Sequence, residues 1–531
     1  MKRYIYIYTA LLTLTVSCTK KFDQINTDPT RANASNFDPN YLFTYAELGY
    51  GNITEYQLYE LSGTTQILSS TFNYYGGGDK YNQFITSYNS RFYTDGMNYA
   101  GQLIAAQNLA QQKDPNRNNN LIQMSRILWV LMMQRITDIY GDIPYTQAGM
   151  GDQGIIYPVY DKQADIYKDM LSRLDNAVNA LDAAKPMPTG DLLYNGDIDK
   201  WKKFGYSVML RVAMRLTKID PAMAQSYTEK AAGKTFAAAS DNALLKFDGN
   251  NSVPLSVNNT ANALGIGANN FTEVRWSNTF VNYLSSHNDP RLLVIAERAD
   301  TGSAYNNDLN HPGIPYTSIK SVIGMPNGYD LTGVQAITTA PGYPGATGTG
   351  TNASPLGNYA RPVTAVFTQK SLPVLMMTYV QTELLLAEAK TKGWNVGSAS
   401  AQTHFANALQ GTFQSLTQLD PKLTVPQDSV ISLIARYKLD VSSTDNALKQ
   451  INSEYWASCI FDFPEAWSNW RRSGYPVLTP VNYPGNITNG TIPRRLPYPS
   501  TNEQNNPVNY KAALDRMGGT DLATTKVWWD K

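Results

Sequence analysis

The chain has 531 residues, enough to bury a large core. Its 44 Lys and Arg residues balance 43 Asp and Glu residues, and no long run of one sign occurs, so neither a nucleic acid nor an acidic polymer is indicated as a partner. Charged residues make up only 16% of the chain, and 35 tyrosines help to give a polar but uncharged surface of the kind that suits neutral ligands such as sugars.

The N-terminus has the pattern of an export signal. Residues 1–3 are positively charged at Lys2 and Arg3, and an apolar stretch follows over 5–16. That stretch is shorter than the roughly 18 residues that a membrane-spanning helix needs. It ends at Ser17-Cys18, a small residue before a cysteine, as at a lipoprotein cleavage site. We predict a signal peptide over 1–17 and lipidation of Cys18. The alternative is an ordinary signal peptide in which Cys18 is incidental.

The segment after Cys18 is polar and has no apolar periodicity, so residues 18–40 are expected to form a lipidated tether and N-terminal arm. The second cysteine, Cys459, lies in an apolar helical stretch and is predicted to be a core thiol. A disulfide between these two positions is not expected.

Apolar residues recur at helical spacing from about residue 41 onward. One stripe runs from Met124 to Ile139, and Gly141 then stops the helix. Similar stripes cover 167–181 and 201–219, and further helices are expected over 373–392, 398–416, 429–439 and 447–461. Trp129, Trp201, Trp456 and Trp467 lie on such stripes and are predicted to be core residues. The pattern indicates an all-α dominated solenoid of helix pairs, stacked like tetratricopeptide repeats, in a single domain over 41–531.

The stretch 245–373 interrupts this pattern with many Asn, Gly and Pro residues, leaving only a short helix near 277–286. A segment this long and rich in turns is either disordered or a set of packed functional loops. We predict packed loops that form a ligand-binding subregion, because the stretch also contains Trp276, Tyr305, Tyr316, Tyr329, Tyr343 and Tyr359. The last 70 residues are rich in proline and are expected to wrap irregularly over the body.

The carboxylates do not form a catalytic pattern. Asp138 and Asp142 lie at a predicted helix end, where capping and turn hydrogen bonds explain them. Glu383 and Glu388 are five residues apart and so do not share a helix face. Glu465 precedes Trp467, Trp470 and Arg471-Arg472, which indicates an ion pair or cation–π cluster that locks the C-terminal segment to the solenoid. A glycoside hydrolase with a helical scaffold remains as an alternative.

Metal and cofactor chemistry is not indicated either. The three histidines, His287, His311 and His404, are far apart in sequence, and no cysteine cluster or calcium-loop spacing occurs. No phosphate-binding loop or nucleophile elbow is present. We therefore predict no catalytic residue, no metal and no cofactor.

Aromatic residues in loops are the positive signal. A sugar ring offers an apolar face and a rim of hydroxyl groups, so a glycan site needs flat aromatic platforms beside hydrogen-bonding side chains. We predict Tyr74, Tyr75, Trp276 and Tyr329 as platforms, with Tyr81 nearby, and Asn73, Asp79, Arg275 and Asn327 as polar partners. The alternative is that these aromatic residues only pack the loops onto the solenoid.

Several runs resemble the SusD/RagB-like family of outer-membrane lipoproteins, in particular the subgroup with an Asn-Thr-Asp-Pro start. The match is specific because the runs keep a common order over nearly the whole chain. They are Phe22 to Pro29, Gln134 to Tyr145, Asn195-Gly196-Asp197, Lys200 to Phe204, Leu210 to Leu216, Asn288 to Leu292, Leu386 to Ala389 with Gly393-Trp394, Glu465 to Arg472, Ile492 to Pro499 and Val527-Trp528-Trp529.

The resemblance implies a fold of four tetratricopeptide-like helix pairs with irregular segments on one side as the ligand face. It also implies a non-enzymatic lipoprotein on the outer membrane, facing the cell exterior, that captures an oligosaccharide or polysaccharide and delivers it to a SusC-like TonB-dependent transporter. A peptide-binding (RagB-like) member of the same family is the alternative, and a structural or adhesion lipoprotein without a small ligand is a further one.

Overall fold

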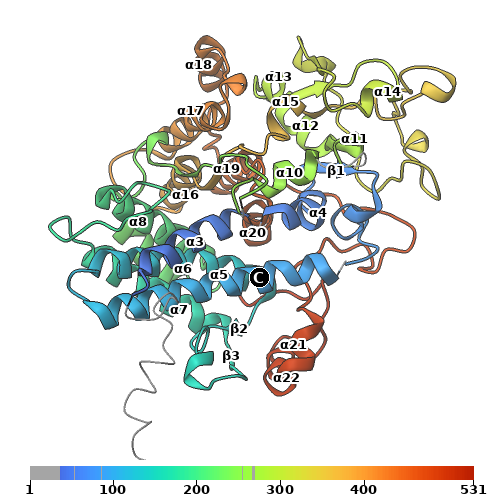
Figure 1. Ribbon diagram of the computed structural model, residues 1–531. Helices are drawn as coiled ribbons and strands as arrows, with labels where there is room; N and C mark the ends of the chain where they lie inside the picture. The colour runs from blue at the N-terminus through green and yellow to red at the C-terminus, as the bar shows by residue number, and fades with distance from the viewer. Residues whose placement is uncertain (1–35, 53, 85, 254, 266–269) are drawn as a thin grey trace, which may run out of the picture. The chain divides into compact units, whose positions relative to one another are not determined.

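The computed structural model describes residues 36–531 except 53, 85, 254 and 266–269 (Figure 1). The chain divides into two compact units, Met1–Pro39 and Asn40–Lys531. The predicted signal peptide, Cys18 and nearly all of the predicted 18–40 arm lie outside the described residues.

Helices make up most of this unit. They are α3 (Pro39–Asn52), α4 (Thr54–Thr64), α5 (Thr86–Lys113), α6 (Asn119–Tyr140), α7 (Gln163–Ala180), α8 (Ile198–Arg215), α9 (Pro221–Ala231), α10 (Asn259–Gly265), α11 (Asn270–Glu273), α12 (Asn278–Ser286), α13 (Leu292–Ile295), α14 (Ser303–Asn306), α15 (Thr364–Phe367), α16 (Tyr379–Thr391), α17 (Ala401–Leu419), α18 (Gln427–Arg436), α19 (Thr444–Ser458), α20 (Phe463–Ser473), α21 (Ser500–Asn505) and α22 (Pro507–Arg516).

Consecutive long helices pack as pairs: α5 with α6, α7 with α8, α16 with α17, and α19 with α20. The pairs also pack on one another, since α6 contacts α7, α16 contacts both α8 and α19, and α20 contacts α6 (Figure 1). Each helix thus buries its apolar face against neighbours, which is the arrangement of a tetratricopeptide-like solenoid. The predicted fold class is confirmed.

Short strands tie distant segments together. The strands are β1 (Leu68–Ser70), β2 (Ile143–Pro144), β3 (Tyr160–Asp161), β4 (Ala243–Leu245), β5 (Val274–Trp276), β6 (Ala296–Arg298), β7 (Ile314–Pro315), β8 (Arg361–Pro362) and β9 (Val374–Met377). All pair antiparallel, as β1 with β5, β2 with β3, β4 with β9, and β6 with both β7 and β8. The pair β1–β5 joins residues some 200 positions apart and anchors the loop-rich region to the helical scaffold.

The helix boundaries follow the sequence signals closely in the first half of the chain. Helix α6 ends at Tyr140, and Gly141 follows with φ of +93°, a conformation that favours glycine. Trp129, Trp201, Trp456 and Trp467 are buried in one large core, and Cys459 is a buried free thiol. These predictions are confirmed.

Two predictions in the second half need correction. The helix expected over 373–392 starts at Tyr379, because Val374–Met377 forms strand β9 against β4 and Thr378 then caps the helix with Gln381 in a capping box. The final segment is also less irregular than expected. It contains α20, α21 and α22, and proline stands in the first turn of α20 and α22, where it needs no hydrogen-bond partner.

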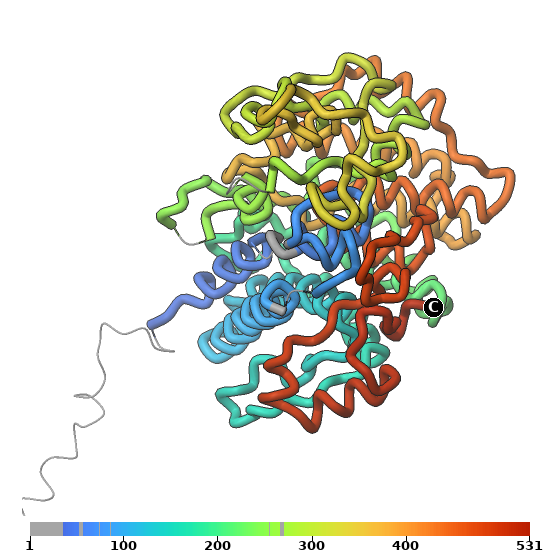
Figure 2. Tube along the Cα trace, turned by 90° about the vertical axis from the view of Figure 1, so that its right-hand side faces the viewer, coloured from blue at the N-terminus to red at the C-terminus, as the bar shows by residue number. Residues whose placement is uncertain are grey.

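The stretch 245–373 packs as loops and short elements with a small core of its own, formed by Met325, Ile337, Ala340, Leu356 and Tyr359. The prediction of packed loops therefore agrees with the structure. In Figure 2 these green and yellow segments lie over the upper part of the unit, beside the blue segment that follows α4.

Glu47 of α3 offers a test of pH-dependent stability. Burial, and then the nearby charge of Asp191, raise its pKa well above the ordinary value of 4.5. The folded protein therefore binds a proton more tightly than the unfolded chain, so this group's contribution to stability is present below pH 4.5 and is lost as pH rises through the folded pKa.

We expect Glu47→Gln, which mimics the protonated acid, to be more stable than the wild type at pH 8, with the difference vanishing near pH 4. Chemical denaturation at both pH values measures this, with exposed Glu503→Gln as the control. If the difference in unfolding free energy between Glu47→Gln and the wild type were the same at pH 8 and pH 4, the raised pKa assigned to Glu47 would be wrong.

Candidate ligand-binding face

Three segments distant in sequence meet on one side of the unit: 66–83, 322–340 and 475–490. We call them the three-loop face. Figure 2 shows the blue, yellow and red tubes side by side. Direct contacts join them, since Asn327 Nδ2 donates to Asp79, Gln335 Nε2 donates to Asn482 O at 3.0 Å, and Ile487 N donates to Tyr81 O at 2.8 Å.

Asp79 is the central clamp of this face. Its Oδ1 accepts hydrogen bonds from Asn327 Nδ2 at 2.6 Å and from Ser70 N at 3.2 Å, and its Oδ2 accepts one from Gly328 N at 2.9 Å. Asn327 Nδ2 also donates to Leu68 O at 2.9 Å. One buried carboxylate therefore fixes the positions of two of the three segments.

Charged residues beside Asp79 connect it to the third segment, 475–490. Lys80 is buried, donates from Nζ to Ser70 O at 3.2 Å and lies 3.9 Å from Asp330. Tyr483 OH donates to the other oxygen of Asp330 at 2.9 Å. Burial raises the pKa of Asp79, although Lys80 and the three hydrogen bonds act in the opposite direction. The cost of burying this carboxylate is therefore substantial, and its bonds to the loops offset that cost.

Glycines allow the close approach on which the clamp depends. A Cβ on Gly77 would lie 2.0 Å from Glu60 Oε2, and a Cβ on Gly78 would lie 2.3 Å from Glu60 O, so the backbone over Gly76–Lys80 (η2) rests directly on α4. Gly328 has φ of +88°, and its Cβ would meet Val481 Cγ1 at 2.3 Å. The Gly-rich sequence here is explained by packing as well as by turns.

Trp276 and Arg275 lie in the core, which corrects the prediction that they contact a ligand. Trp276 is 0% exposed, donates from Nε1 to Ile295 O at 3.1 Å and stacks on Phe280. Arg275 is equally buried and donates to Leu356 O, Phe271 O, Val274 O and Asn306 Oδ1. Burial, and then the charge of Arg361, lower the pKa of Arg275 to about 9. Both residues belong to β5, whose pairing with β1 takes them inside.

Tyr75, Asp79 and Tyr81 are also buried and serve as supports rather than contact residues. Tyr75 OH donates to Asn270 Oδ1 at 3.3 Å, and its ring packs edge-on against Tyr59. Tyr81 has φ of +54° and ends the tight turn of η2. The side chain of Tyr74 lies outside the described residues.

The remaining predicted residues have accessible surface. Asn73 is exposed and Asn327 is half-buried, and the half-buried Tyr329 packs against the small second core. The structure adds residues that the sequence did not single out: Tyr483 is half-buried, and Val334, Val477 and Ile487 are 83%, 75% and 59% exposed. The three-loop face thus combines rings, amides and apolar side chains on a rigid base.

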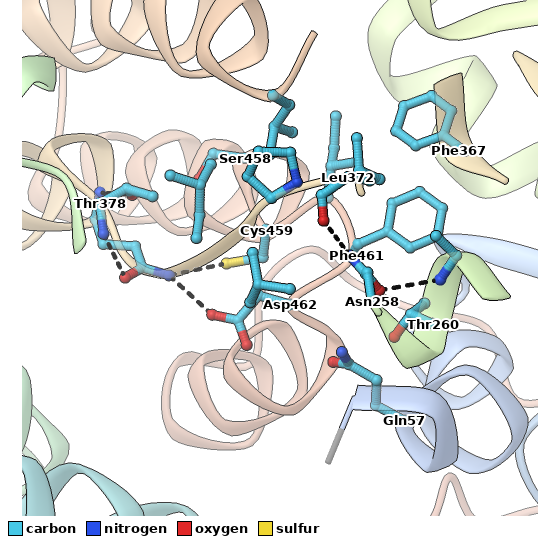
Figure 3. A pocket seen from close by; sticks show the side chains of 17 residues that line it. Gln57, Asn258, Thr260, Phe367, Leu372, Thr378, Ser458, Cys459, Phe461 and Asp462 are labelled. Carbon is cyan, nitrogen blue, oxygen red and sulfur yellow. Dashed lines mark hydrogen bonds between the residues drawn. The ribbon is translucent and has the colours of Figure 1, made fainter. Parts of the chain in front are cut away.

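A separate cavity lies inside the unit, where α10, β9, α16 and the turn after α19 meet (Figure 3). Its volume is about 50 Å³, which holds a few water molecules but no sugar ring. Gln381 Nε2 spans it, with Cys459 Sγ at 3.8 Å and Asp462 Oδ2 at 3.2 Å. A saccharide does not fit in this cavity.

The carboxylates that raised the question of catalysis are engaged in structural contacts. Asp138 accepts bonds from Arg215 Nε at 3.2 Å and Trp529 Nε1 at 3.0 Å, and Glu465 accepts two bonds from Arg215 Nη2. Glu388 pairs with Arg472 at 2.7 Å. The predicted locking cluster is confirmed, since the Arg471 guanidinium lies over the rings of Trp467 and Trp529.

Within the part of the chain that the structure describes, no three His, Cys, Asp or Glu side chains gather in a way that would hold a metal ion. None of the described helices combines the length and apolar character needed to cross a membrane.

The profile of the SusD-like family, described as starch-binding and associating with the outer membrane, matches residues 31–499. The chain therefore belongs to the SusD-like family. A comparison with curated proteins finds no match.

Solved structures agree with this assignment. A chitin-binding protein is 28% identical, covers 93% of this chain and 100% of its own length, and superposes with a TM-score of 0.77. A Bacteroidetes SusD-like protein, AC2a, is 24% identical over 93% of this chain and 100% of its own, with a TM-score of 0.78. A chitin-binding SusD homologue from Flavobacterium johnsoniae is 20% identical over 93% of this chain and 98% of its own, with a TM-score of 0.71. The last two likenesses establish the shared fold.

Proposed function

We propose that this protein is a non-catalytic, lipid-anchored binding protein of the outer membrane, facing the cell exterior, that captures oligosaccharides and delivers them to a SusC-like TonB-dependent transporter. The family assignment supports the outer-membrane setting, and a 28%-identical structure described as a chitin-binding protein supports a carbohydrate ligand. Acylation of Cys18 provides the anchor in this proposal. The observation that carries the binding role is the three-loop face, which is held together by the buried Asp79 and presents partly exposed aromatic and amide side chains.

The ligand contacts proposed on this face are Tyr329 and Tyr483 as ring platforms and Asn73 and Asn327 as hydrogen-bonding partners. A sugar ring stacks its C–H face on a tyrosine while the amides bond to its hydroxyl groups. Each aromatic contact contributes roughly 0.5–1.5 kcal/mol beyond its buried area. A few such contacts give reversible binding, which suits a protein that hands its ligand on.

The double variant Asn73→Ala/Tyr329→Ala tests the proposed contact residues. We expect the double variant to bind its oligosaccharide about tenfold more weakly or worse, because it loses one ring contact and one hydrogen-bonding partner. Calorimetric titration with chitohexaose, maltohexaose and a mixed peptide library measures the affinities and also distinguishes a peptide-binding protein.

The matched control for this test is Tyr305→Ala, which removes a tyrosine that is 41% exposed and packs on His311 away from the face. It should bind like the wild type, and thermal melting should show that all variants are folded. If the double variant keeps full affinity, the residues assigned to the face are wrong.

A further inference from the structure

The side-chain amide of Asn327, on the three-loop face, has no hydrogen-bond donor left for a ligand. Both of its N–H groups are used inside the protein, since Nδ2 donates to Leu68 O at 2.9 Å and to Asp79 Oδ1 at 2.6 Å. Leu68 O is a carbonyl oxygen and can only accept, so the orientation of the amide is fixed. Its oxygen, Oδ1, accepts no hydrogen bond within the described residues and is not one of the buried atoms there. Asn327 therefore offers a ligand an acceptor and no donor.

The half-buried Gln335 is in the same state. Its Nε2 donates one N–H to Gly328 O at 2.7 Å and the other to Asn482 O at 3.0 Å, and both partners are carbonyl oxygens. Its Oε1 accepts no hydrogen bond within the described residues and is not buried there. Because Gly328 follows Asn327 and Asn482 precedes Tyr483, the Gln335 amide lies between two residues that are proposed to contact the ligand.

Tyr483 has also used its donor. Its one O–H donates to Asp330 Oδ2 at 2.9 Å, and Asp330 lies 3.9 Å from the buried Lys80. The phenol oxygen keeps only the capacity to accept. Asn73 differs, because it is exposed and its side-chain amide has no partner among the described residues, so it can turn to suit a donor or an acceptor. The polar atoms that the protein holds in place on this face are therefore acceptors.

The charges of the face have the same bias. Its three segments contain three charged residues, Asp79, Lys80 and Asp330, and Lys80 is 0% exposed. Glu273 of α11 adds a carboxylate beside the first segment, since it accepts a hydrogen bond from Thr71 Oγ1 at 2.6 Å. The segments thus carry more negative than positive charge, and they have no accessible cation to pair with a carboxylate or a sulfate.

We propose that the three-loop face selects saccharides that present hydrogen-bond donors, namely free hydroxyl or amino groups, and rejects acidic saccharides. This selectivity rests on the proposed function, because it concerns the same face. Donors of the sugar bind Asn327 Oδ1, Gln335 Oε1 and the Tyr483 oxygen, which makes Gln335 a specificity-determining residue. A carboxylate has no hydrogen to donate, and it meets fixed acceptors and neighbouring carboxylates. It therefore loses hydrogen bonds and is repelled.

Three forms of one hexasaccharide test this order of preference. The parent is whichever of chitohexaose and maltohexaose binds the full mature chain more tightly. The other two forms carry an ammonium group or a carboxylate at C6 of each ring in place of the hydroxyl, so the rings and the linkage stay the same. At about 0.15 M salt, we expect the amino form to bind at least as tightly as the parent and the carboxylated form about tenfold more weakly.

Gln335→Met separates recognition from support of the loops. Methionine keeps the length of the side chain but has no amide oxygen. We expect the parent and the amino form to bind about fivefold more weakly and the carboxylated form to change little, so the preference narrows. If Gln335 only supported the loops, all three forms would weaken by the same factor. Thermal melting checks that the variant is folded.

Val334→Lys tests the role of charge without touching the hydrogen-bonded residues. Val334 is 83% exposed and precedes Gln335, and a lysine there should narrow the preference for the parent over the carboxylated form about threefold. Val441→Lys, at a residue between α18 and α19 that is 70% exposed, is the matched control and should leave the preference unchanged. Lys320→Gln, two residues before the second segment, should leave it unchanged as well.

The outcomes separate this inference from the proposed function. Binding of the carboxylated form as tightly as the parent, or binding of the carboxylated form alone, would overturn the selectivity and leave oligosaccharide capture standing. A uniform loss in Gln335→Met, or a changed preference in Lys320→Gln or Val441→Lys, would also overturn it. If none of the three forms binds at about millimolar concentration, the proposed function fails and the selectivity fails with it.

Discussion

Replacing Glu465 with Gln is expected to lower the free energy of unfolding by about 3–5 kcal/mol, the cost of removing one partner from a buried ion pair. Glu465 of α20 accepts two bonds from Arg215 of α8 at 2.8 and 2.9 Å and one from Tyr455 of α19 at 2.9 Å, and Arg211 lies 3.8 Å away. The variant keeps the shape of the side chain, but it leaves Arg215 with Asp138 as its one remaining ion-pair partner within the described residues and takes away the carboxylate beside Arg211.

The pH dependence of this effect has a definite sign. Burial raises the pKa of Glu465, but the charges of Arg215 and Arg211 outweigh burial and hold it below the ordinary 4.5. The contribution of the carboxylate is therefore fully present above pH 4.5 and is lost as pH falls through the folded pKa. The deficit of Glu465→Gln should shrink in acid.

An exposed pair provides the control for Glu465. Lys511 and Asp515 lie 2.6 Å apart on α22 with their side chains 74% and 54% exposed, so Asp515→Asn should cost less than about 1 kcal/mol. Urea denaturation measures both variants. A cost for Glu465→Gln no larger than that of the control would show that α20 is not held by this ion pair.

Replacing Asp79 with Ala is expected to abolish oligosaccharide binding and to cost about 3 kcal/mol or more of stability. The change removes the acceptor shared by Ser70, Asn327 and Gly328, and it takes away one of the carboxylates whose charge opposes that of the buried Lys80. Segments 66–83 and 322–340 should then lose their common anchor even though none of the proposed contact residues has changed.

Hydrogen exchange tests this structural explanation directly. In Asp79→Ala, amides over 322–340 should exchange faster, while those of α6 should change little. Asp79→Asn retains the size of the side chain and should have a smaller effect. Unchanged protection of 322–340, or full ligand affinity in Asp79→Ala, would show that Asp79 does not organise the face.

The helical half of the fold is predictable from sequence because its signals are local. The stripe before Gly141 defines α6, and the tryptophans on such stripes are buried as expected. The role of Glu465 also follows from its neighbours in sequence, since Trp467 and Arg471 lie on the same short helix.

The loop residues are harder to predict because long-range pairing decides their exposure. The turn-forming residues around Trp276 predict an exposed side chain. However, β5 pairs with β1, some 200 residues earlier in the chain, and Trp276 is therefore buried. Tyr483 was missed because nothing near it in sequence indicates that its segment reaches Asp330. The sequence predicts two of the three segments as loops, while the way they assemble depends on buried contacts such as those of Asp79.

Titration of the wild-type protein with chitohexaose and maltohexaose, followed by chromatography of the recovered sugar, tests the proposed function most directly. We expect saturable binding of at least one of them, with the hexasaccharide recovered at its original length. Absence of binding at about millimolar sugar, or recovery of shortened products, would contradict a protein that captures oligosaccharides without cleaving them.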